Sequence, residues 1–162
     1  MIRLATLLLL CASSLLAAQT SRDRPSLTWL AGAGLSTAAD GDLQLVQFWA
    51  SWCHSCAGVT TDLAALVRQH PGVLHLAVST DAERADAQGA AARMLGYAGG
   101  AAVIAHDPGE FAALHQVVTV PTVLLLTPEG RELGRYTGHL NATDLMALSA
   151  LLAHPVGKET AP

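Results

Sequence analysis

The sequence carries little charge, and its basic residues are dispersed. Charged residues make up 14% of the 162 positions, and the nine lysines and arginines form no run or stripe. Proteins that bind nucleic acid need clustered positive charge against the phosphates, so no nucleic-acid partner is expected. The apolar share of 51% excludes a chain that is disordered by composition. The length fits one globular domain preceded by a short leader.

Cysteine is also scarce, with three in the chain. Cys11 lies within an apolar N-terminal leader, so the mature chain would keep one pair, Cys53 and Cys56. A disulfide between cysteines this close in sequence closes almost no loop and adds little stability, so chemical reactivity better explains the pair. A zinc site would need a second Cys/His pair, and haem attachment would need a His where Ala57 stands. No metal or other cofactor is predicted.

The first eighteen residues have the pattern of a signal peptide. Arg3 supplies the positive start, residues 4–16 form the apolar segment, and Ala17-Ala18 offers small residues for cleavage. The apolar segment is shorter than the roughly 20 residues of a membrane-spanning helix. The sequence therefore predicts export, in a bacterium to the periplasm. An uncleaved leader that anchors the protein to the membrane is the alternative.

The rest of the chain divides into a linker, one domain and a tail. Residues 19–42 are predicted to be a polar linker with a short helical turn at Leu27–Leu30, capped by Ser26. The domain is expected to span residues 43–154, and residues 155–162 form a polar, flexible tail.

Strand and helix patterns alternate through the domain. Strands are predicted at residues 43–49, 73–78, 101–105 and 123–126, with a hairpin partner at 131–136. Helices are predicted to follow Cys53, to fill residues 81–95, and to begin under caps by Asp107 and Asn141. This order predicts an α/β fold, with a mixed central sheet, helices on both faces, and a C-terminal hairpin plus helix.

The segment Phe48-Trp49-Ala50-Ser51-Trp52-Cys53-His54-Ser55-Cys56 carries the chemistry. Cys53 is expected at the N-terminus of a helix, where free N–H groups and the helix dipole favour a thiolate. Cys56, one turn further, is expected to be covered and to resolve a mixed disulfide formed at Cys53. His54 would stabilise the Cys53 thiolate further where it is protonated, and a solvent-facing His is the simpler alternative.

This segment resembles the active-site motif of the thioredoxin superfamily. A second landmark, Thr119-Val120-Pro121-Thr122, resembles the proline loop that faces the cysteine pair in those proteins. The resemblance implies a cis Val120–Pro121 bond, substrate pairing by the Val120 backbone, and a redox-active Cys53–Cys56 disulfide. It also implies that Trp52 shapes the substrate groove, whereas Trp49 is expected to pack in the core.

The subfamily resembled is that of TlpA-like exported thioredoxins. The resemblance rests on the extra segment 81–107 before the proline loop, together with Gly130 and Gly138. The chain departs from the family at Gln47, where thioredoxins proper carry a buried Asp, and at Val59, where many TlpA-type proteins carry a Glu. Carboxylates at these positions help to move protons for the buried cysteine.

These features favour an exported disulfide reductase that acts on protein thiols and disulfides and draws electrons from a membrane donor. An oxidase or isomerase is the alternative, because the spacer His54-Ser55 lacks the proline of common reducing members. A Cu(I)-binding module on Cys53, His54 and Cys56, and an interaction module without turnover, are further alternatives. Six other histidines lack ligand spacing and are predicted to be surface or hydrogen-bonded residues: His70, His75, His106, His115, His139 and His154.

Overall fold

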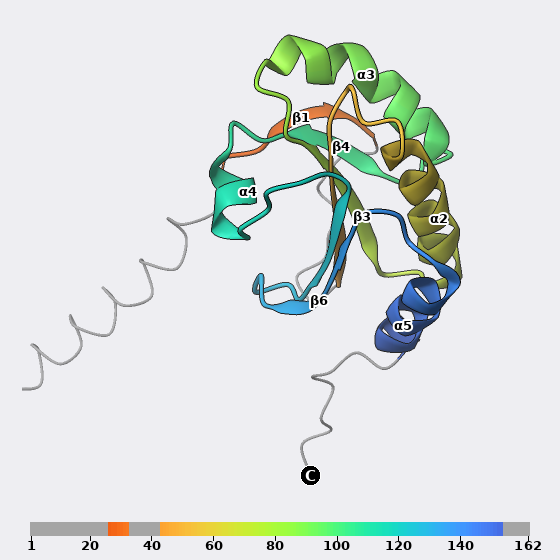
Figure 1. Cartoon of the computed structure of the whole chain (residues 1–162). Coiled ribbons are helices and arrows are strands. Elements are labelled where there is room, and N and C mark those ends of the chain that lie inside the picture. Colours follow the sequence, from red (N-terminus) through yellow and green to blue (C-terminus); the bar gives the residue numbers. More distant parts are fainter. Residues whose placement is uncertain (1–25, 33–42, 154–162) are drawn as a thin grey trace, which may run out of the picture.

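The computed structural model describes residues 26–32 and 43–153. Within these residues a six-stranded sheet runs in the order β1-β4-β3-β2-β5-β6, with helices packed against it (Figure 1). The predicted signal peptide and the predicted tail lie outside the described residues. Among the helices that are described, none has the length and apolar character required to cross a membrane.

The sheet is mixed, as the sequence predicts. Its strands are β1 Thr28–Ala31, β2 Gln44–Trp49, β3 Leu74–Ser79, β4 Val103–His106, β5 Thr122–Leu126 and β6 Glu132–Thr137. Strands β2, β3 and β4 are parallel, whereas β1, β5 and β6 each run antiparallel to their neighbours. Parallel neighbours need crossover connections, which α2 and α3 provide. The carboxyl ends of β2 and β3 therefore meet at one edge of the sheet.

Helices cover both faces of the sheet, which confirms the predicted α/β architecture. On one face lie α2 Cys56–Gln69, α3 Arg84–Tyr97 and α5 Ala142–Ala153, and on the other lies the short α4 Glu110–Leu114 (Figure 1). The side chains of β2 alternate between these layers. Val46 and Phe48 pack in the α4 cluster, whereas Leu45 and Trp49 pack in the clusters beneath α2. This alternation places Gln47 on the α2 face, directly below the cysteine motif.

Two helix starts carry the side-chain hydrogen bonds that their sequences predict, although α4 begins at Glu110 with Gly109 as its N-cap and not at Pro108 as expected. The Asp107 carboxylate accepts hydrogen bonds from the backbone N–H groups of Gly109, Phe111 and Ala112 ahead of and within α4. At α5 the Asn141 side chain accepts from the N–H of Asp144, whose carboxylate accepts in return from the N–H of Asn141. These caps satisfy donors that have no partner inside the helix.

The predicted helical turn at Leu27–Leu30 is wrong, because Thr28–Ala31 forms strand β1 instead. This strand pairs antiparallel with β4, with Trp29 opposite Ala105. Leu27 packs on the α4 side of the sheet and Leu30 on the α3 side. A helical turn would put residues three apart on the same side, so only the extended chain packs the two partly buried leucines against opposite faces of the sheet. The extended conformation is therefore stabilised by pairing with β4, which lies more than 70 residues away in the sequence.

Candidate active site

The two cysteines form a disulfide at the junction of β2 and α2. Their sulfurs are bonded, and their Cα atoms lie 5.5 Å apart. Cys56 is fully buried, whereas Cys53 is partly exposed. The sulfur that an external thiol or disulfide can approach is therefore that of Cys53.

Helix α2 begins at Cys56 and not at Cys53 as expected. The chain makes a turn after β2, in which the N–H of Cys53 donates to the carbonyl of Ala50, and Ser55 is the N-cap. Cys53 thus lies three residues before the helix, and its disulfide to the first helical residue holds it there. No acidic residue lies in the first turn of α2, so nothing in that turn offsets the positive end of the helix dipole.

The Asp81 carboxylate fixes the loop that carries Cys53. It accepts from the Ser51 N–H at 2.9 and 3.0 Å, from the Ser51 hydroxyl at 2.8 Å, and from the Ser79 hydroxyl at 2.7 Å. Asp81 is 5% exposed, so these bonds to a charged acceptor are shielded from water. The sequence pattern predicts Asp81 only as the first residue of a helix. The missed signal was its position at the end of β3, on the edge that the cysteine motif shares.

A buried polar cluster lies beneath Cys56. The Gln47 amide donates to the carbonyl of Cys56 at 3.0 Å. The Thr60 hydroxyl lies 2.8 Å from that carbonyl and 2.9 Å from Gln47 Oε1, and its single proton serves one of them at a time. His75 Nε2 lies 3.4 Å from the same Gln47 oxygen. The three side chains are buried, so their orientations are held by one another.

His75 corrects the expectation that the histidines are surface or fully hydrogen-bonded residues. Its ring is 1% exposed, and its Nδ1 has no hydrogen-bond partner among the described residues. Burial lowers the pKa of His75 from 6.5 to about 4, so the ring is neutral at neutral pH. His106 is also buried, but its Nε2 pairs with the carbonyl of Asp81 at 2.9 Å.

The proline loop lies at the same end of the sheet as the disulfide, because Thr122 at the start of β5 pairs with Phe48 near the end of β2. The Val120–Pro121 peptide bond is cis, and the Gly138 N–H donates to the Pro121 carbonyl at 2.8 Å. Val120 and Cys53 pack against the same buried cluster, which contains Trp49 and Cys56. The fold therefore brings together the two landmarks that the sequence identified, although they are more than 60 residues apart.

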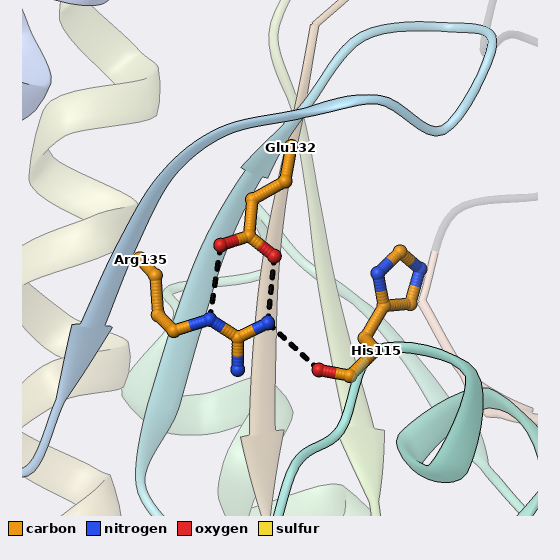
Figure 2. Close-up of polar contacts among 3 residues, drawn as sticks. All are labelled: His115, Glu132 and Arg135. Atoms are coloured by element: carbon orange, nitrogen blue, oxygen red, sulfur yellow. Dashed lines mark hydrogen bonds and ion pairs between the residues drawn. The ribbon is translucent and has the colours of Figure 1, made fainter.

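An ion pair on β6, between Glu132 and Arg135, is hydrogen-bonded to the segment that leads into the proline loop (Figure 2). Arg135 donates to both oxygens of Glu132, at 2.9 and 2.6 Å, and to the carbonyl of His115 at 2.7 Å. The His115 ring points away from this group and packs edge-on against Phe111. The hydrogen bonds from Arg135 lower the pKa of Glu132. The pair is about one-third exposed, so it is worth at most about 1 kcal/mol and acts chiefly by fixing the loop.

On the opposite side of the disulfide a cavity of about 260 Å³ separates the active-site loop from α3. Cys53, Trp52 and His54 line it from the loop, and Arg93 and Tyr97 line it from α3. Trp52 is 67% exposed, which leaves its face open to a ligand, whereas Trp49 is buried as predicted. His54 is exposed at the rim. Across the described ranges, no group of three or more His, Cys, Asp or Glu side chains is arranged to hold a metal ion.

Comparison with solved structures identifies the fold. A protein from Chlorobium tepidum described as a thiol:disulfide interchange protein DsbE matches 81% of this chain and 94% of its own, with 26% identity and a TM-score of 0.61. The chain has the thioredoxin fold, and it is similar to this thiol:disulfide interchange protein over most of the length of both. Scans against protein-family models and against curated proteins find no match.

Two further structures share the fold at lower identity. A secreted Mycobacterium tuberculosis disulfide oxidoreductase, homologous to E. coli DsbE, is 20% identical over 78% of this chain and 92% of its own, with a TM-score of 0.59. StoA from Bacillus subtilis is 19% identical over 78% of this chain and 96% of its own, with a TM-score of 0.57. A CxxC disulfide in this fold is suited to thiol–disulfide exchange.

We expect Asp81→Asn to lower the free energy of unfolding by about 2 kcal/mol. The substitution removes the charge from the hydrogen bonds and turns an amide donor toward donors on Ser51 and Ser79. Urea unfolding of the oxidised protein measures the loss. Asp86→Asn, at an exposed site on α3, is the matched control and should cost less than about 1 kcal/mol. Equal losses in the two variants would contradict the tethering role of Asp81.

His75 should make stability depend on pH. Between about pH 6.5 and 4 the unfolded chain binds a proton that the folded chain does not. The free energy of unfolding therefore decreases as the pH is lowered from about 6.5 to 4, by up to about 3 kcal/mol. Below pH 4 the contribution of His75 no longer changes with pH. We expect His75→Phe to remove this slope, whereas His139→Gln, at an exposed site, should keep it. Parallel urea stability curves for the wild type and His75→Phe would exclude a buried neutral His75.

Proposed function

We propose that this protein is an exported thiol–disulfide oxidoreductase that reduces disulfides in client proteins. The observation that carries the proposal is the unequal burial of the cysteines, with Cys56 covered and Cys53 open between the proline loop and the α3 cavity. Export is supported by the leader pattern and by the likeness to thiol:disulfide interchange proteins. Clients would then be proteins outside the cytoplasm, and reducing power would come from a membrane donor.

The exchange proceeds in two steps that conserve electrons. The Cys53 thiolate attacks one sulfur of a client disulfide, so that a mixed disulfide forms and the other client sulfur leaves as a thiolate. Cys56 then loses its proton and attacks the Cys53 sulfur, which releases the second client thiolate and forms the Cys53–Cys56 disulfide. The client gains two electrons and the protein loses two. In this scheme the backbone of Val120 pairs with the client chain beside Pro121, and Trp52 contacts it across the disulfide.

The reverse direction is the second candidate. His54 lies beside Cys53, and a cation there would stabilise the thiolate, favour the reduced form and make the disulfide a stronger oxidant. A Cu(I) module is less well supported, because the described residues add no further ligand to Cys53, Cys56 and His54.

Trapping variants test the roles of the two cysteines. Cys56→Ser should accumulate disulfide-linked complexes with a disulfide-bonded protein client, because the second step is lost. Cys53→Ser is the matched control and should form none, since Cys56, the other cysteine of the motif, is covered. Non-reducing gel electrophoresis with mass spectrometry gives the readout. If Cys53→Ser traps the client and Cys56→Ser does not, the assigned roles are wrong.

The reduction potential tests the direction of electron flow. The protein is equilibrated in glutathione buffers of known ratio, and its free thiols are trapped by alkylation. A reductase should have a potential near about −270 mV, as in thioredoxin. A value near about −120 mV would reject the reductase and favour the oxidase. His54→Ala should then lower the potential if the imidazole stabilises the thiolate.

A further inference from the structure

The cavity between the active-site loop and α3 is separate from the proline loop, yet Cys53 forms part of both surroundings. We propose that this cavity is a client subsite, which selects clients that carry an acidic residue next to the reacting cysteine. The inference rests on the proposed thiol–disulfide exchange, because it concerns the client segment that is bonded to Cys53 during the reaction.

The dimensions of the cavity suit a side chain. Its volume of about 260 Å³ lies below the range of about 300–1,000 Å³ that is typical of small-molecule pockets. Its walls combine the exposed aromatic rings of Trp52 and Tyr97 with the apolar surface of Met94 and Ala90. Because Cys53 lies in the wall, a client sulfur bonded to it would bring the residues next to the client cysteine into the cavity.

The charge of the cavity favours an anion. Arg93 and His54 line it, and no Asp or Glu does. Arg93 is exposed and makes no ion pair within the described residues, and its only polar contact there is a 3.5 Å hydrogen bond to the Gly89 carbonyl. The Asp81 carboxylate does not line the cavity, and it accepts hydrogen bonds from Ser51 and Ser79. The whole chain has a formal charge of −4, so its net charge does not attract an acidic client. The expected attraction comes from the charge in this cavity alone.

A set of peptides tests the subsite. Three disulfide-bonded peptides differ only in the residue beside the cysteine, which is Asp, Ser or Lys. The reduced protein should react with the Asp peptide about fivefold faster than with the Lys peptide at low ionic strength, and salt should narrow the difference. Arg93→Glu should reverse the preference. Arg84→Glu makes the same charge change on the same helix but outside the cavity, so it should keep the wild-type order.

The outcomes separate the subsite from the proposed function. Reduction of all three peptides without preference, or the same preference in wild type and Arg93→Glu, would overturn the subsite alone. An equal slowing of all three peptides by Arg93→Glu would mean that the guanidinium acts on the Cys53 thiolate rather than on the client, and would also overturn it. Failure of the wild-type protein to reduce any peptide or protein disulfide would instead reject the proposed function, on which the subsite depends.

Discussion

The position of the reactive sulfur depends on one buried carboxylate. The loop between β2 and α2 has few backbone hydrogen bonds of its own, and Asp81 supplies its anchor through Ser51. The contact exists because β2 and β3 are parallel, so that the residues following both strands meet at the same edge of the sheet. The hydrogen bonds to Ser51 hold the loop that carries Trp52 and Cys53 in place relative to the sheet. The charge of Asp81 is tolerated in a buried site because four hydrogen bonds satisfy it.

Beneath Cys56 the protein uses neutral groups. Thioredoxins proper carry a carboxylate where this chain has Gln47, and the structure shows how the amide fits, with its nitrogen on the Cys56 carbonyl and its oxygen on Thr60 and His75. A neutral amide with satisfied partners costs less to bury than a carboxylate. However, an amide has no proton to exchange at neutral pH. The cluster is therefore better suited to supporting Cys56 than to accepting a proton. In the proposed exchange, the proton released by Cys56 would have to leave by another route.

Local patterns predicted most of this structure, and long-range contacts account for what they missed. The central strands, the capped helices at Asp107 and Asn141, and the cysteine motif each carry their signal within a few neighbouring residues. Strand β1 does not, because its conformation depends on pairing with β4, which packs Leu30 and the adjacent Leu27 against opposite faces of the sheet. The tether between Ser51 and Asp81 spans 30 positions, and only the parallel pairing of β2 and β3 brings the two together. His75 could have been recognised, since it interrupts a strand that is apolar on both faces, which is typical of a covered position.

The two sides of Cys53 are built from different parts of the chain, and in the proposed function this division would separate exchange chemistry from client recognition. The proline loop and the strand that follows it lie on one side, held by Arg135 through the His115 carbonyl and by Gly138. The other side is formed by α3, which lies in the segment on which the sequence resemblance to TlpA-like proteins rests. Residues on the exposed surface of α3 can change without disturbing Asp81, Gln47 or the disulfide, because their contacts to the core are made by the small buried side chains Ala87, Ala90 and Ala91. A helix of this kind can alter which clients reach Cys53 while the groups that support the cysteine pair stay in place.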